Sequence, residues 1–152
     1  MEHDRTLSAV FPIILRQNGG TEQILLYRRI NTGYMDGKWD IAAGGHVDRG
    51  ETATETLARE CGEEIGITVR PEDAAFAHLC HSVERSGRQT YYNLYLRVRT
   101  YTETPTIMEP EKCAALEWFD LSRLPEDMIP ARKRDLLLAL AGRMYRESLR
   151  EE

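Results

Sequence analysis

The chain has 152 residues, of which 41% are hydrophobic and 30% are charged, and its formal net charge is −5. This length and composition are typical of one soluble globular domain, which we expect to span residues 1–152. The acidic balance and the absence of a long basic run disfavour binding to a nucleic-acid polymer or a membrane surface.

The N-terminal third of the chain predicts three strands. Residues 7–16 are mostly apolar and predict the first, in which Pro12 indicates an edge position or a bulge. A turn with two glycines leads to a second strand at residues 23–29, so we expect a hairpin. Residues 31–38 form a predicted loop, and residues 39–43 a short apolar strand.

A glycine-rich loop then leads into a helix. Thr52 is the expected N-cap, with Glu55 three residues later to complete a capping box. Gly66 is expected to end the helix in the left-handed conformation. Apolar residues at helical spacing predict one buried stripe, namely Ala53, Leu57, Cys61 and Ile65.

Three carboxylates follow one edge of that stripe. At about 100° per residue, Glu60, Glu63 and Glu64 lie on the same side of the helix. Such like charges repel one another, and a cation would remove the repulsion. Oxygen ligands of this kind suit a hard ion such as Mg²⁺ or Mn²⁺. A solvated acidic helix face is the ordinary alternative.

The second half of the chain predicts three more strands and a second helix. Strands are expected at residues 75–85, 89–99 and 116–119, and a helix at residues 131–149 with Pro130 in its first turn. Strands with two long helices predict an α/β fold. The three cysteines are widely spaced, which disfavours disulfides and a zinc site and favours a reducing cytoplasm.

The loop and helix together resemble the signature of the Nudix hydrolases. That signature is Gly, five residues, Glu, seven residues, Arg-Glu, an apolar residue, any residue, Glu-Glu, any residue, Gly and an apolar residue. This chain matches it at Gly45, Glu51, Arg59, Glu60, Cys61, Glu63, Glu64, Gly66 and Ile67. The resemblance implies a MutT-like protein with an α/β/α sandwich around a mixed, curved β-sheet.

The resemblance also implies roles for individual residues. Glu60, Glu63 and Glu64, with the carbonyl of Gly44, would hold the metal, and Glu60 would also orient or deprotonate the nucleophile. Among the other signature residues, Gly45 and Gly66 would shape the backbone, and Glu51 and Arg59 would form an ion pair between loop and helix. The family often adds a distant carboxylate, for which Glu111 is the first candidate and Glu109 the second.

Candidates for substrate contacts lie before the helix. In the family, arginines after the second strand approach phosphate, which implicates Arg28 or its neighbour Arg29. For these arginines a surface or core-rim position is at least an equal explanation. Tyr34 and Trp39 could stack on a base, and His46 could touch a phosphate, although packing is the commoner role for such aromatics and an ordinary loop position is the commoner one for such a histidine.

The implied reaction is metal-dependent hydrolysis of the pyrophosphate bond in a nucleoside diphosphate linked to another group. Sequence markers of the ADP-ribose and NADH subfamilies are absent, which leaves a nucleoside triphosphate or a small nucleotide derivative as substrate. A noncatalytic Nudix scaffold that binds nucleotides or regulates a partner is the alternative, and the complete set of signature glutamates disfavours it. Dimers are common in the family, so a homodimer is possible.

Overall fold

The computed structural model describes residues 1–86 and 89–150. In chain order, its elements are β1 (Thr6–Asn18), β2 (Thr21–Arg29), β3 (Trp39–Ile41), β4 (Gly45–His46), α1 (Ala53–Ile65), the 3₁₀ turn η1 (Pro71–Asp73), β5 (Ala74–Glu84), β6 (Thr90–Val98), β7 (Cys113–Asp120), α2 (Pro130–Leu140) and β8 (Tyr145–Arg150). The first hairpin and both predicted helix starts are confirmed.

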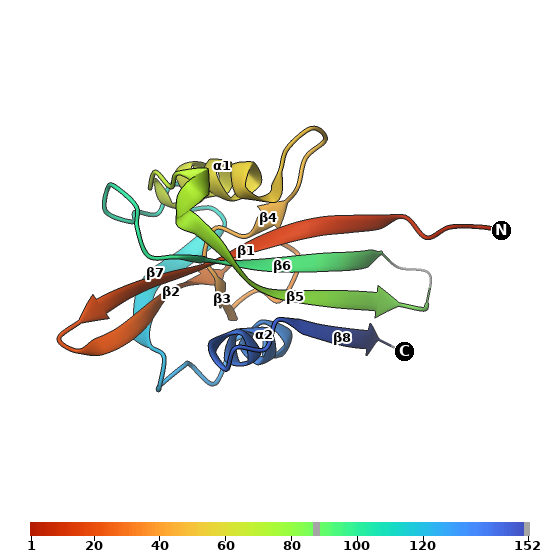
Figure 1. The fold of residues 1–152 in the computed structure, drawn as a ribbon. Helices are drawn as coiled ribbons and strands as arrows, with labels where there is room; N and C mark the ends of the chain where they lie inside the picture. Colours follow the sequence, from red (N-terminus) through yellow and green to blue (C-terminus); the bar gives the residue numbers. More distant parts are fainter. Residues whose placement is uncertain (87–88, 151–152) are drawn as a thin grey trace.

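The described residues form one mixed, eight-stranded sheet. Its main path runs β3-β2-β1-β6-β5-β8, while β4 pairs with β1 and β7 with β2. The pairs β1–β6 and β5–β8 are parallel, and the remaining pairs are antiparallel. Figure 1 shows α1 on one side of the sheet and α2 on the other. The predicted α/β/α arrangement is therefore confirmed.

Strand β1 is apolar on both faces because it lies in the middle of this sheet. Phe11, Ile13 and Leu15 belong to the core cluster that also contains residues of α2. Val10 and Ile14 point to the opposite face and belong to the cluster that contains residues of α1. One strand thus supplies both halves of the core.

Pro12 lies at a local edge of β1, as predicted, although the strand as a whole lies inside the sheet. Pro12 lies opposite Leu96 of β6 in an unbroken parallel register. On its other side, β1 pairs with β4 at Ala9–Val10 and with β2 at Leu15–Asn18. Between these pairings, no described strand lies along that side of β1, so the missing proline amide breaks no ladder bond there.

Helix α1 has the predicted ends and the predicted buried face. The Thr52 side chain accepts from the Glu55 amide, the Glu55 side chain accepts from the Thr52 amide, and Gly66 adopts φ 68°. Leu57, Cys61 and Ile65 are buried, and Ala53 packs against them. Local sequence alone therefore fixes where this helix begins, where it ends and which face it buries.

The C-terminal segment differs from our prediction of one helix over residues 131–149. Helix α2 ends at Leu140, and Gly142 follows it with φ 77°. The Gly142 amide donates to Ala139 O and the Arg143 amide to Leu138 O, which is the Schellman arrangement. The chain then reverses, and β8 pairs in parallel with β5.

Replacing Gly142 with alanine is expected to lower the free energy of unfolding by about 1 kcal/mol, because an L-residue is strained at positive φ. Nothing lies within 4 Å of the position that a Cβ atom would take, so backbone strain is the whole effect. Urea unfolding measures the change, and Ala141→Gly, next to it at φ −82°, is the control. Equal stability of Gly142→Ala and the wild type would contradict this account.

A buried polar cluster joins α2 to β5, β6 and β8. Asp135 of α2 is 1% exposed and accepts hydrogen bonds from Tyr95 Oη and Arg146 Nε, both at 2.7 Å. His78, which is fully buried, places Nε2 3.1 Å from Asp135 Oδ1 and Nδ1 2.7 Å from Arg143 O. The carboxylate therefore anchors β8 through Arg146.

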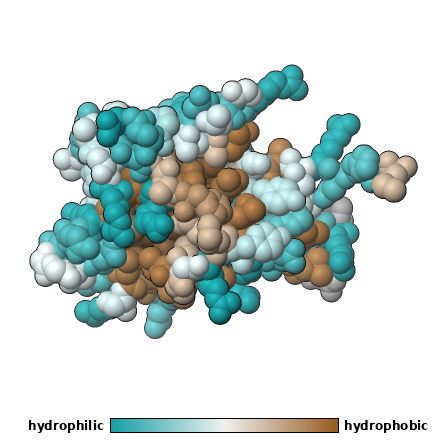
Figure 2. All heavy atoms as spheres, in the orientation of Figure 1, coloured by the Kyte–Doolittle hydropathy of each residue, from teal (hydrophilic) through white to brown (hydrophobic). Residues whose placement is uncertain are grey.

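Three further features concern the surface, the cysteines and the helices of the described residues. Figure 2 shows hydrophobic residues gathered in the middle of one face of the molecule, with hydrophilic residues over α1. The three cysteines are free in the structure, with Cys61 and Cys80 buried and Cys113 partly exposed. In the described part of the chain, no helix has the length and apolar character needed to cross a membrane.

Candidate active site

The loop before α1 approaches the helix so closely that it determines where Glu60 lies. A Cβ atom built on Gly45 would lie 2.4 Å from Glu60 Cδ and 2.5 Å from Glu60 Oε1. Only glycine leaves this space free for the carboxylate. Gly45 therefore acts directly on the position of a predicted metal ligand.

Replacing Gly45 with alanine is expected to lower the metal-dependent hydrolysis that the signature implies by about 100-fold, because the Glu60 carboxylate must move by about an ångström. The free energy of unfolding should change little, since the clashing group is the end of a flexible side chain. The matched control is Gly62→Ala in α1, where no atom lies closer than 3.9 Å to the new Cβ. An active Gly45→Ala variant in a steady-state assay would contradict the assignment.

Arg59 ties the loop to the helix, as predicted. Its Nε and Nη2 donate to the two oxygens of Glu51 at 2.8 and 2.9 Å. The Arg59 hydrogen bonds hold the pKa of Glu51 well below its ordinary value, at about 2. Arg59 Nη1 also contacts Glu60 at 2.9 Å and Glu63 at 3.3 Å. One guanidinium thus orients two of the three clustered carboxylates.

Glu60 and Glu64 form a close pair on the inner side of α1. The two carboxyl groups are close enough that the charge of Glu60 and a hydrogen bond between them both favour the protonated form of Glu64. Burial, reinforced by the Glu60 charge, raises the pKa of Glu64 to about 8. Burial also raises the pKa of Glu60. Glu63 differs from both, because 57% of its side chain is exposed and it contacts Arg59.

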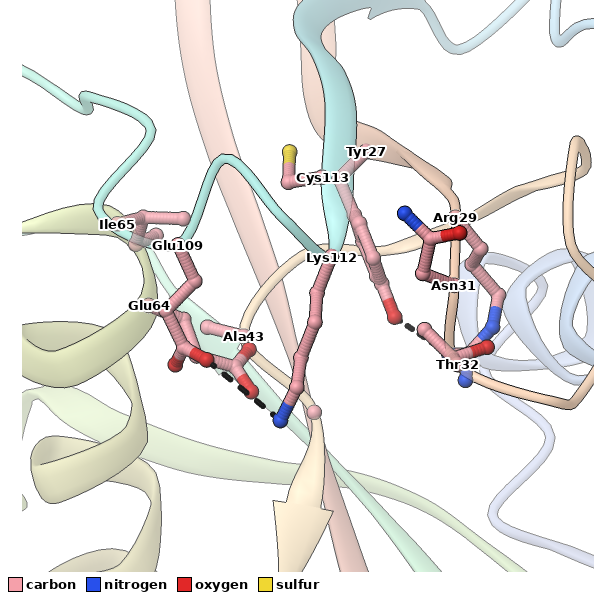
Figure 3. Close-up of a pocket in the computed structure, with 11 residues that line it drawn as sticks. Tyr27, Arg29, Asn31, Thr32, Ala43, Glu64, Ile65, Glu109, Lys112 and Cys113 are labelled. Carbon is pink, nitrogen blue, oxygen red and sulfur yellow. Dashed lines mark hydrogen bonds and ion pairs between the residues drawn. The ribbon is translucent and has the colours of Figure 1, made fainter.

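A pocket of about 280 Å³ opens beside this pair. Figure 3 shows Glu64 and Glu109 on one side of it, Tyr27 and Arg29 on the other, and Lys112 between them. The full lining is Tyr27, Arg29, Asn31, Thr32, Ala43, Gly44, Glu64, Ile65, Glu109, Lys112 and Cys113. The pocket therefore has an acidic wall that faces a wall with a fixed guanidinium.

The donors on the acidic wall fit a hard divalent cation. Within residues 1–86 and 89–150, no three His, Cys, Asp or Glu side chains are already arranged as a metal site. Glu60 and Glu64 nevertheless offer paired carboxylate oxygens, and Gly44 lines the same pocket with backbone atoms. The raised pKa of Glu64 means that a proton can offset the repulsion between the two carboxyl groups, and a divalent ion would do so with more charge.

The structure places Arg29 in the pocket and Arg28 outside its lining. Arg29 donates to Asp40 at 3.0 Å, to Tyr34 O at 2.8 Å and to Tyr27 Oη. Arg28 points to the opposite face of β2, where it contacts Asp127 at 3.3 Å. Successive residues of a strand alternate between its faces, so only one of the two arginines can face the acidic wall.

The other predicted substrate residues lie outside the pocket lining. Trp39 is 6% exposed and packs edge-on against Phe119, so it belongs to the core. The Tyr34 ring is exposed, with its centroid 5.4 Å from the Arg29 guanidinium. His46 Nε2 lies 3.1 Å from Tyr91 Oη. Contacts of Tyr34 and His46 with a substrate stay predictions.

Of the two candidates for the distant carboxylate, Glu109 lines the pocket and Glu111 does not. The negative charge of Glu109 also contributes to the raised pKa of Glu64, so the two side chains are near neighbours. The Glu111 side chain is exposed, and its carbonyl accepts from Asn31 Nδ2 at 3.0 Å. The structure therefore favours Glu109, the second choice from sequence.

Sequence reasoning missed several lining residues. Strand parity could have found Tyr27, because Leu25, Tyr27 and Arg29 alternate with the residues that face α2. Asn31 and Thr32 belong to a loop, and Lys112 to the segment before β7, so no periodic pattern marks them. Their place follows from pairing between β2 and β7, which are far apart in sequence.

Comparison with known proteins identifies the family. Residues 6–140 match the model of the NUDIX domain. The chain belongs to the Nudix family. The match covers β1 to α2 and includes the whole glycine-rich loop and α1, so the predicted membership and the predicted class of hydrolase are confirmed.

Two relatives of this Nudix protein are similar over most of its length. A protein of Bacillus subtilis (strain 168) named "Putative 8-oxo-dGTP diphosphatase" is 32% identical over 126 residues, which are 83% of this chain and 74% of that protein. A protein of Caenorhabditis elegans named "Putative nudix hydrolase 1" is 30% identical over 135 residues, or 89% of this chain. The chain spans 34% of the worm protein's length.

Two solved structures share the fold of this chain. The crystal structure of the MutT NUDIX hydrolase from Burkholderia pseudomallei has a TM-score of 0.75 at 24% identity, over 91% of this chain and 98% of that one. The solution structure of the E. coli ORF135 protein has a TM-score of 0.72 at 26% identity, over 91% of each chain. The predicted Nudix fold is therefore confirmed.

Proposed function

We propose that this Nudix enzyme hydrolyses a pyrophosphate bond in a nucleoside triphosphate, or in a small nucleoside diphosphate derivative, with Mg²⁺ or Mn²⁺ as cofactor. The observation that supports the proposal is the buried Glu60–Glu64 pair beside a pocket whose far wall carries Arg29. When bound, the divalent ion supplies positive charge to the phosphate oxygens and makes the attacking water more acidic. Most of this chemistry requires positioning and neutralisation of charge.

The proposal gives a role to each of the residues at or near the pocket. Glu60, Glu63, Glu64 and the Gly44 carbonyl would hold the metal, and Glu109, on the same wall of the pocket as Glu64, would add a carboxylate. Glu60 also orients the water or takes its proton, to which its raised pKa is suited. Arg29, held by three acceptors, binds phosphate oxygen without reorganisation. A new P–O bond forms to water and the bridging P–O bond breaks.

The name of the Bacillus subtilis relative makes 8-oxo-dGTP the first substrate to test. The products would be 8-oxo-dGMP and pyrophosphate. We would measure pyrophosphate release from 8-oxo-dGTP and the ordinary deoxynucleoside triphosphates, and phosphate release from nucleotide sugars after phosphatase treatment. We expect activity with Mg²⁺ that disappears with EDTA. Nucleotide binding without turnover in any condition would support the noncatalytic scaffold instead.

The choice between the two distant carboxylates gives a direct mutational test. We expect Glu109→Gln to lower kcat/KM by about 10–100-fold, because its carboxylate lines the pocket where we propose that the metal binds. Glu111→Gln, which removes the same charge from the exposed neighbour, should stay within about 2-fold of the wild type. A larger loss in Glu111→Gln than in Glu109→Gln would restore Glu111 as the functional residue.

The predicted homodimer is tested separately by light scattering.

A further inference from the structure

Lys112 is a loosely held positive charge in the pocket. Its Nζ atom lies 3.8 Å from Glu109 Oε2, and 61% of its side chain is exposed. Figure 3 shows the side chain in the middle of the pocket, with its ammonium directed toward Glu64 and Glu109. A pair at this distance is longer than a hydrogen bond and stabilises the protein only weakly. The side chain is therefore free to change partners.

The backbone of Lys112 is, in contrast, fixed at the pocket. Its amide donates to Glu109 O at 3.0 Å, and its carbonyl accepts from the Ile30 amide at 3.1 Å. These bonds hold the Cα atom between the acidic wall and the end of β2. The flexible stem of lysine can then carry the ammonium from one wall toward the pocket centre without any backbone change.

The two arginines near the pocket are already committed. Arg29 donates to Tyr27, Asp40 and the Tyr34 carbonyl, and Arg59 to Glu51, Glu60 and Glu63. These partners hold both guanidiniums in place, so Arg29 can meet a phosphate only as a fixed charge. Lys112, with one weak ion pair, is the cation that can move toward an incoming anion.

We propose that Lys112 exchanges partners when the enzyme is loaded: it pairs with Glu109 in the metal-free protein and with a phosphate oxygen of the nucleotide once a divalent ion is bound. This inference rests on the proposed function, which supplies the ion and the nucleotide. The ion and the ammonium compete for one carboxylate and repel each other. The polyphosphate is the nearest anion that can then receive the ammonium.

The exchange predicts effects of opposite sign for Lys112→Met. Calorimetry of the substrate-free protein should show Mn²⁺ binding tightened about 3-fold, because an exposed ion pair no longer competes. Binding of the non-hydrolysable α,β-methylene analogue of dGTP in the presence of Mg²⁺ should weaken about 10-fold, because a hydrogen bond to a charged group is lost. The control is Lys133→Met in α2, outside the pocket lining, which removes the same charge and should change neither value.

Repeating the Lys112→Met comparison in the Glu109→Gln variant separates the change of partner from a general electrostatic effect of removing a positive charge. In Glu109→Gln, the Lys112→Met change should no longer tighten Mn²⁺ binding, because the carboxylate for which they compete is gone, whereas the loss of analogue binding should persist. Wild-type Mn²⁺ affinity in Lys112→Met, or the same gain in both backgrounds, would overturn the exchange. Failure of the proposed function looks different: the wild type would hydrolyse no nucleotide while the Mn²⁺ comparison still decides the exchange.

Discussion

Glu64→Gln is expected to abolish metal-dependent hydrolysis and, at the same time, to stabilise the metal-free protein. Loss of a charged ligand beside the phosphates should lower kcat by at least about 100-fold. The variant should fold, because glutamine has nearly the same shape and can still donate a hydrogen bond to Glu60. Steady-state kinetics over a range of Mg²⁺ concentrations measures the first effect. Wild-type turnover would reject the metal role of Glu64.

The stability effect has a definite pH dependence. The pKa of Glu64 is about 8 in the folded protein and 4.5 in the reference state, so the folded state binds an extra proton between these values. An acid of this kind lowers the free energy of unfolding as pH rises through that window. Glutamine removes this loss, so the variant should be more stable by about 1–3 kcal/mol near pH 7.5.

Thermal unfolding in EDTA at several pH values measures this difference, which should shrink toward pH 4.5. Glu63→Gln is the matched control, because Glu63 is the next residue of α1 but is 57% exposed. It should lose activity without the gain in stability. Parallel pH profiles for wild type and Glu64→Gln would show that Glu64 is not held protonated by its surroundings.

Asp135→Ala is expected to cause the largest loss of stability in the fold, about 3–5 kcal/mol. The carboxylate accepts from Tyr95, His78 and Arg146, and its removal leaves a largely buried guanidinium and two buried polar groups without their partner. Strand β8 depends on Arg146 for this anchor. Amide hydrogen exchange in β8 should therefore accelerate more than in β6.

Denaturant unfolding measures the loss, and Asp127→Ala is its control. Asp127 pairs with Arg28 where both side chains are more than 40% exposed, so its removal should lower the free energy of unfolding by less than about 1 kcal/mol. A comparable loss in both variants would mean that burial of the Asp135 cluster is not what stabilises it.

Helix α1 was predictable because its determinants are local. Thr52, Glu55 and Gly66 act on neighbouring backbone groups, and the buried stripe follows from helical spacing. The signature residues extend this to the loop, where Gly45 meets Glu60. The acidic half of the site was thus accessible from one continuous segment of sequence.

The half of the site that carries Arg29 and Glu109 could not be predicted from local sequence, because pairing between distant strands determines where these residues lie. The choice between Arg28 and Arg29 depends on which face of β2 meets α1, and the choice between Glu109 and Glu111 depends on how the loop before β7 returns to β2. The apolar residues from 136 to 145 repeat with helical spacing, so we predicted one long helix where the structure has α2 followed by β8. Strand β8 forms only by pairing with β5, although Gly142 between the two elements was a local signal for the end of the helix.

The position of Arg146 has a consequence for the order in which the fold is completed. Asp135, Tyr95 and His78 all precede it in the chain, so the Asp135 carboxylate gains its Arg146 partner only when β8 docks beside β5. A state in which β8 is detached therefore leaves this carboxylate in the core without its guanidinium.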